Sequence, residues 1–282
     1  MNTALEALSY PFFQRAIIAG VLASVACGLI GSFVVVKRIT SISGGLSHAA
    51  FGGVGLGLVL GFSPWIGAVV FTLVCALILG AVYHRRPEAL EPAISTLWAG
   101  GMALGILLVS LAPGPKPDLM GYLFGSILFV PSDYLWLVLA LDLALLAGLF
   151  LLFKELQASV FDETFAASLG LPTALLLQLI LGGCALVIVV LIRIVGIVLV
   201  IALLSVPAVV ARQWAESLPR MMFGAILIGV VCTTGGLAAS YAFSVISKLD
   251  VPSGPLVILL AILTYGVSSV LRSLRTSRGE HE

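Results

Sequence analysis

Residues 173–192 read TALLLQLILGGCALVIVVLI, a run without a charged side chain. A helix needs about 20 apolar residues to cross the hydrocarbon core of a bilayer, so this run is long enough to span it. The sequence therefore predicts nine membrane-spanning helices, or eight if the runs on either side of Arg193 form one bent helix. The other predicted helices cover 13–36, 42–60, 65–83, 93–111, 133–153, 195–211, 221–243 and 255–271.

The composition agrees with a membrane domain and excludes several other classes of protein. Of the 282 residues, 61% are hydrophobic and 10% are charged, against roughly 25% charged in a typical soluble domain. A soluble fold of this length could not hide so much apolar surface from water. The formal net charge of +1 offers no broad basic surface for nucleic acid. We predict an all-α, polytopic integral membrane protein in which 1–282 form a single transmembrane domain surrounded by membrane lipid.

The basic residues orient the predicted helices. Ten of the 14 lysines and arginines fall in one set of loops and four in the other, and loops rich in Lys and Arg face the cytoplasm. Nine helices then place the C-terminus inside and the N-terminus outside. The apolar stretch 113–131 is interrupted by prolines, so we expect a surface loop followed by a partly re-entrant helix around 123–129.

Glycine and polar residues inside the predicted helices suggest two further features. Gly45, Ala49, Gly53, Gly57 and Gly61 recur every four residues, a spacing that lets helix backbones pack closely, although such a helix could instead line a narrow path. The second feature is a break between two predicted helices, of the kind that often lines a cavity in transporters. The residues that mark this break are Arg193 and Gly196.

Polar side chains are costly in a bilayer, so those inside the predicted helices are the candidate functional residues. His48 lies in SGGLSHAA at 43–50, and neutral imidazole binds divalent ions, although a histidine hydrogen-bonded between helices is the plainer interpretation. Asp142 lies in LALDLAL and is expected to pair with an arginine or hydroxyl, or to act as a cation relay. Asp250 lies among helix breakers, where it could cap the last predicted helix.

Several catalytic signatures are missing from the sequence. It contains no G-x-x-x-x-G-K-[ST], so the chain does not bind ATP by a P-loop. It also contains no H-E-x-x-H or G-x-S-x-G, which are common hydrolase motifs. Each of the four cysteines lies alone in an apolar run, as is typical of small core residues.

The segment 158–172 reads ASVFDETFAASLGLP and differs from a simple connector. Asp162 is expected to cap a short helix, Glu163 adds charge that suits the helix N-terminus, and Gly170 closes the helix. Such a cytoplasmic helix suits docking into a groove of another protein, although a helix lying on lipid headgroups is the plainer alternative. One face of this helix would carry Phe165, Ala166 and Leu169.

Six segments in this order are similar to one family. They read FVVVKR at 33–38, GLSHAAFGGV at 45–54, DLMGYLFGSIL at 118–128, FDETFA at 161–166, VGIVLVIALLSVPA at 195–208 and DVPSGP at 250–255. From Phe12 to Leu271 the chain resembles the permease subunits of bacterial ABC importers for zinc, manganese and related divalent metals. The resemblance implies a type II ABC importer permease fold in the cytoplasmic (inner) membrane, without catalytic activity of its own.

The resemblance also implies partners and site residues. It implies a homodimer with the path at the subunit interface, ATPase subunits docked on the coupling segment 158–172, and an external metal-binding protein. The divalent metal is then a transported substrate, and no tightly bound cofactor is implied. The family's histidine falls on His48. The coupling role falls on Asp162, Glu163, Phe165 and Gly170.

Two positions depart from the family pattern. Many members have Asp four residues before the histidine, where this chain has Gly44, and the acidic residue after YLFG is Ser126 here. Both changes favour a largely hydrated path that coordinates the ion transiently, with a neighbouring serine, water or Asp142 as a weak substitute. The alternative function is an ion-gradient-driven secondary transporter with His48 and Asp142 as relays. An intramembrane enzyme is disfavoured because the chain lacks a nucleophile motif.

Overall fold

The computed structural model describes residues 9–113, 121, 123, 125, 127, 130–248 and 251–279. Nine of the described helices are long and apolar enough to cross a membrane, which confirms the predicted number. They are α2 (Pro11–Val36), α3 (Ser41–Leu60), α4 (Pro64–Arg85), α5 (Leu90–Leu111), α7 (Ser132–Phe161), α9 (Thr173–Val195), α10 (Ile197–Trp214), α11 (Leu218–Ser247) and α12 (Ser253–Gly279). Two short helices complete the described elements, η1 (Pro87–Ala89) and α8 (Glu163–Ser168).

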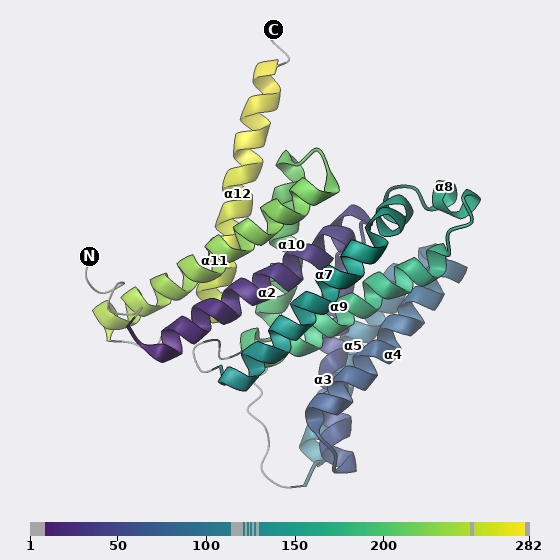
Figure 1. The fold of residues 1–282 in the computed structure, drawn as a ribbon. Helices are drawn as coiled ribbons and strands as arrows, with labels where there is room; N and C mark the ends of the chain where they lie inside the picture. The colour runs from purple at the N-terminus through teal and green to yellow at the C-terminus, as the bar shows by residue number, and fades with distance from the viewer. Residues whose placement is uncertain are drawn as a thin grey trace.

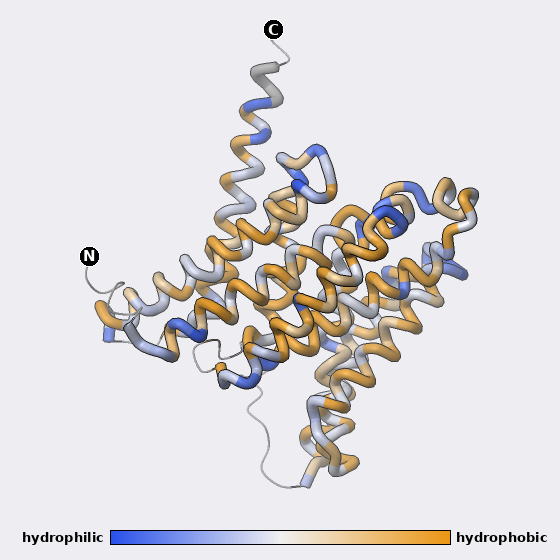
Figure 2. The backbone as a smooth tube through the Cα atoms, in the orientation of Figure 1, coloured by the Kyte–Doolittle hydropathy of each residue, from blue (hydrophilic) through white to orange (hydrophobic). Residues whose placement is uncertain are grey.

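The long helices pack in two groups on either side of a central layer. On one side α3 packs against α4 and α5, and on the other α10, α11 and α12 pack together (Figure 1). Between them lie α2, α7 and α9, which contact one another; α2 also packs on α10 and α11, and α9 on α4. Figure 2 shows hydrophobic residues along most of each helix and hydrophilic residues gathered near α8 and at the α10–α11 connection.

The two apolar runs around Arg193 form separate helices. α9 continues through Arg193 and ends at Val195, and Gly196 separates it from α10 with φ +83° and ψ 162°. Glycine reaches this backbone conformation readily, whereas a residue with a Cβ would be strained there. The break is therefore set by Gly196, while the charged residue lies in the last turn of α9.

The predicted loop and re-entrant helix at 113–131 lie largely outside the described residues. Where the structure describes them, Gly121 is helical and its carbonyl accepts a hydrogen bond from the Gly125 amide at 2.9 Å. Gly125 has φ +69°, and a Cβ added there would collide with the backbone of Val195 and Gly196. Because Gly125 and Gly196 have no side chains, the backbone at Gly125 can pack directly on the α9–α10 break.

The small-residue stripe of α3 is a packing surface. A Cβ added at Gly53 would lie 2.8 Å from the Cα of Ala68, and one at Gly57 would lie 2.7 Å from the Cα of Pro64, both on α4. A Cβ added at Gly45 would lie 2.9 Å from a side chain of α5. Neighbouring helices thus occupy the stripe, which confirms the packing interpretation and not the narrow path. We call α3, α4 and α5 together the α3–α5 unit.

Candidate functional site

His48 lies on α3 against an aromatic ring from α5. Its imidazole stacks on the indole of Trp98, with ring centroids 4.8 Å apart and planes inclined by 23°. A Cβ added at Gly44 would lie 2.7 Å from Cζ3 of the same indole. Trp98 therefore fills the space in which a carboxylate side chain at position 44 would stand. Among the residues that the structure describes, the buried His48 Nδ1 and Ser47 Oγ have no hydrogen-bond partner.

Asp142 is isolated from His48. It lies within α7 and is 3% exposed, and neither carboxylate oxygen has a hydrogen-bond partner among the described residues. The expected arginine or hydroxyl partner is therefore not found in the part of the chain that the structure describes. α7 packs against α2, α8 and α9, whereas α3 packs chiefly against α4 and α5, so the two residues belong to different packing groups. Asp250, the third candidate, lies outside the described residues.

The described residues hold no ready-made metal cage. Within the part of the chain that the structure describes, no group of three or more His, Cys, Asp or Glu side chains is placed to bind a metal ion.

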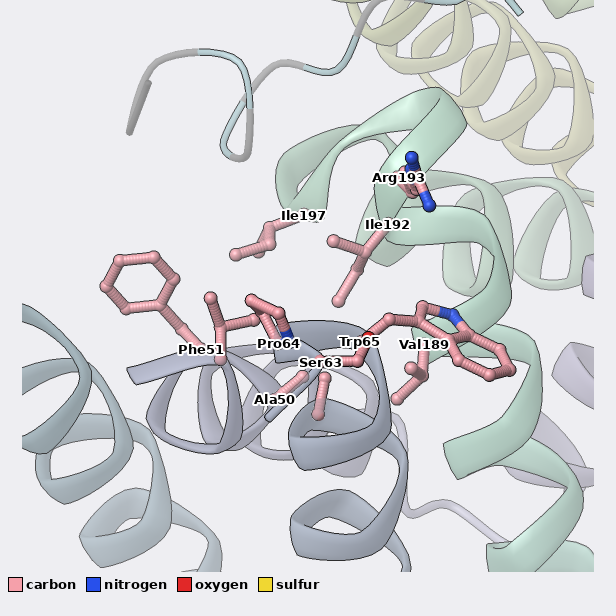
Figure 3. A pocket seen from close by; sticks show the side chains of 11 residues that line it. Ala50, Phe51, Ser63, Pro64, Trp65, Val189, Ile192, Arg193 and Ile197 are labelled. Atoms are coloured by element: carbon pink, nitrogen blue, oxygen red, sulfur yellow. The ribbon is translucent and has the colours of Figure 1, made fainter. Parts of the chain in front are cut away.

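A cavity of about 340 Å³ opens between α3, α4, α9 and α10 (Figure 3). It adjoins the α9–α10 break, as expected of a broken helix in a transporter. The Arg193 guanidinium lies 4.9 Å from the centroid of the Tyr134 ring, and the buried Trp65 Nε1 has no hydrogen-bond partner within the described ranges. The described residues that line the cavity include no carboxylate, thiol or imidazole. It is lined by Ala50, Phe51, Val54, Ser63, Pro64, Trp65, Ala68, Val189, Ile192, Arg193 and Ile197.

The coupling segment forms the capped helix α8. The Asp162 carboxylate accepts a hydrogen bond from the Phe165 amide at 2.9 Å, which confirms the predicted cap. Gly170 has φ +79° and follows the helix, as predicted for a residue that closes it. The helix is shorter than the segment, because residues 158–161 continue α7 to its end.

The exposed face of α8 is narrower than the sequence suggests. Phe165 is 57% exposed and Leu169 61% exposed, whereas Ala166 is fully buried. A helix turns about 100° per residue, so residues four apart share a face and the next residue along does not. The prediction that Ala166 shares the exposed face is therefore wrong. Figure 1 shows α8 at an outer edge of the bundle. The large apolar side chains exposed on it are Phe165 and Leu169.

Glu163 is bonded to the bundle and not left at the outer surface. Its carboxylate pairs with the Lys37 Nζ at 2.5 Å and accepts a hydrogen bond from the Tyr83 hydroxyl at 3.2 Å. The Lys37 Nζ also donates to the Ser159 carbonyl at 3.3 Å and lies 5.2 Å from the centroid of the Tyr83 ring. We call Lys37, Tyr83, Ser159 and Glu163 the Lys37 cluster. Sequence reasoning did not single out Lys37 or Tyr83 as partners of Glu163, and the one signal was the position of Lys37 within FVVVKR.

Comparison with known proteins places the chain in a family. The sequence profile of the ABC 3 transport family matches residues 9–272. A membrane protein of Synechocystis sp. is 44% identical over 268 residues, which cover 95% of this chain and 93% of that protein. The manganese transport system membrane protein MntC of Halalkalibacterium halodurans is 33% identical over 263 residues, covering 93% and 88%.

A solved structure shares the fold. PsaBC from Streptococcus pneumoniae, in complex with Fab, superposes with a TM-score of 0.80 at 28% identity and covers 94% of each chain. The apolar helices and these matches agree on one assignment. The chain is a multi-pass membrane protein that belongs to the ABC 3 transport family.

Proposed function

We propose that this chain is the membrane-spanning permease subunit of an ABC importer for divalent metal ions of the manganese or zinc type. The family match and the relative named for manganese transport support a metal as the substrate. The sequence lacks a P-loop, so ATP hydrolysis is assigned to a partner chain. The observation that carries the proposal is α8, a capped helix between two membrane helices with an exposed apolar pair.

The proposed assembly has three kinds of partner. A second copy of the chain forms a homodimer around the path, ATPase subunits bind Phe165 and Leu169, and an extracytoplasmic metal-binding protein delivers the ion. Asp162 and Gly170 shape α8 by capping and closing it. An apolar pair on a short helix is the chemistry that fits a hydrophobic groove.

His48 is the proposed contact of the ion along the path. The unpartnered Nδ1 supports this role, because neutral imidazole is a ligand for borderline divalent ions. The side chain beside His48 is the indole of Trp98 and not a carboxylate. This favours brief contact of His48 with a hydrated ion and argues against tight binding.

The test is ATP-dependent uptake of radioactive manganese by vesicles that contain this chain with or without its ATPase subunit, with the metal-binding protein supplied outside. Uptake is expected only with both proteins and ATP inside, and competing zinc ranks the two metals. Phe165→Asp should prevent co-purification of the ATPase, whereas Ala167→Asp puts the same charge on another exposed side of α8 and should not. Accumulation by the chain alone under a proton or sodium gradient would refute the proposal and favour a secondary transporter.

A further inference from the structure

The Lys37 cluster joins α8 to three membrane helices at one point. Lys37 directly follows α2, Tyr83 lies in the last turns of α4, and Ser159 lies near the end of α7. All of them contact either the Glu163 carboxylate or the ammonium group that pairs with it. The first residue of α8 is therefore fixed to the bundle, while its apolar pair is exposed.

Lys37 has a strong physical reason to keep this partner. Its side chain is 5% exposed, and a buried charge is costly unless a counter-charge and hydrogen bonds compensate it. Glu163 supplies the charge, and the Ser159 carbonyl and the Tyr83 ring complete the surroundings. A movement of α8 that carried Glu163 away would leave the ammonium unpaired, so Lys37 is expected to follow it.

The backbone connection from Lys37 to α3 is short and held in place. Arg38 takes the left-handed conformation with φ +62°, and Ile39 is buried and donates its amide to the Val34 carbonyl at 3.1 Å. α3 begins two residues later, at Ser41. A displacement of Lys37 therefore acts on the start of the helix that carries His48. The Tyr83 hydrogen bond connects the same carboxylate to α4, so both contacts lead into the α3–α5 unit.

We infer that Lys37 and Glu163 are the joint that passes movement of α8 to the α3–α5 unit, a role that rests on the proposed function. Two faces of α8 then have different roles. Phe165 and Leu169 bind the partner, and Glu163 passes the displacement through Lys37 to α3 and through Tyr83 to α4. Lys37 and Glu163 are positioning residues, since neither touches the ion or the nucleotide.

The experiment measures metal uptake and ATP hydrolysis in the same vesicles, with the complete complex. Lys37→Met and Glu163→Gln break the ion pair, and the double variant with Lys37→Glu and Glu163→Lys reverses it. Matched controls are Arg220→Met and Glu216→Gln, which break an exposed ion pair of 3.0 Å elsewhere in the chain. The ratio of metal carried to ATP hydrolysed should fall roughly tenfold in both single variants, the size of effect seen along coupling networks. The charge-reversed double variant should restore part of this ratio, and the control variants should leave the ratio unchanged.

Each other outcome overturns the inference for a distinct reason. An unchanged ratio in Glu163→Gln, which keeps the shape of the side chain, means that the pair transmits nothing. Hydrolysis that falls in step with uptake, together with loss of the ATPase on purification, places Glu163 on the docking surface. Lower thermal stability with an unchanged ratio means that the pair only holds α8 in place. Absence of ATP-dependent uptake in the wild type refutes the proposed function itself, and it is seen before any variant is compared.

Discussion

Replacing Gly53 with alanine tests how closely α3 and α4 pack. The added methyl group would lie 2.8 Å from the Cα of Ala68 and would also press on the Gly67 carbonyl. Carbon atoms pack at about 3.5–4.0 Å, so the helices would have to separate by roughly 1 Å. The opposing atoms belong to the backbone and cannot rotate away. Overpacking of this kind costs about 1–3 kcal/mol.

A control removes the effect of helix preference. Alanine favours a helix over glycine by about 1 kcal/mol wherever it is placed. At Gly148 on α7 an added Cβ meets no atom within 4 Å, so Gly148→Ala reports that preference alone. The difference between the two variants isolates the packing cost. At about 2–4 °C per kcal/mol, Gly53→Ala should melt roughly 2–12 °C below Gly148→Ala.

The buried cysteines of the chain provide a probe of unfolding. All four cysteines are buried, so a dye that becomes fluorescent on reaction with thiols reports the loss of structure in detergent. The control is the same measurement on wild-type protein at the same detergent concentration. If Gly53→Ala melts at or above the temperature of Gly148→Ala, the close approach of α3 and α4 is refuted.

Five further substitutions, used in four experiments, test the site and α8. His48→Ala should lower manganese uptake and leave dimer assembly intact; unchanged uptake would leave His48 with a packing role only. Gly44→Asp should lower thermal stability because Trp98 occupies the space, and adding Trp98→Ala should restore stability and tighten manganese binding in a titration. Asp142→Asn should melt no lower than wild type, because neither oxygen has a partner to lose; lost uptake at unchanged stability would favour the relay. Gly170→Ala should lower the melting temperature by about 2–8 °C, since a left-handed backbone with a Cβ costs about 1–2 kcal/mol.

The helices could be predicted because their signals are local. Each apolar run is long enough to cross a bilayer, and Pro11 and Pro64 stand in the first turns of α2 and α4, where a missing amide costs nothing. Gly61, with φ +76°, ends α3 as a glycine C-cap does. The Asp162 cap was equally visible because its partner is three residues away.

The rest of the site depends on how distant helices meet. Lys37 and Glu163 are 126 residues apart, so no spacing rule connects them. The resemblance to the family indicated that a carboxylate is missing at Gly44, and only the packing of α5 on α3 shows that Trp98 occupies that space. Asp142 was expected to have a partner because burial of a lone charge is costly, and the structure leaves it without a hydrogen-bond partner.

The glycine contacts of the α3–α5 unit have a mechanical consequence. At Gly53 and Gly57 the backbones of α3 and α4 approach without side chains between them. Few rotamer changes could absorb a shear there, so we expect the unit to move as a stiff lever. α3 has 20 residues, which makes the lever roughly 30 Å long. A tilt of about 5° at its inner end displaces its outer end by roughly 2.6 Å over that length. That end borders the cavity at Ser63 and Pro64, so a small rotation at one membrane face could widen or narrow an opening near the other.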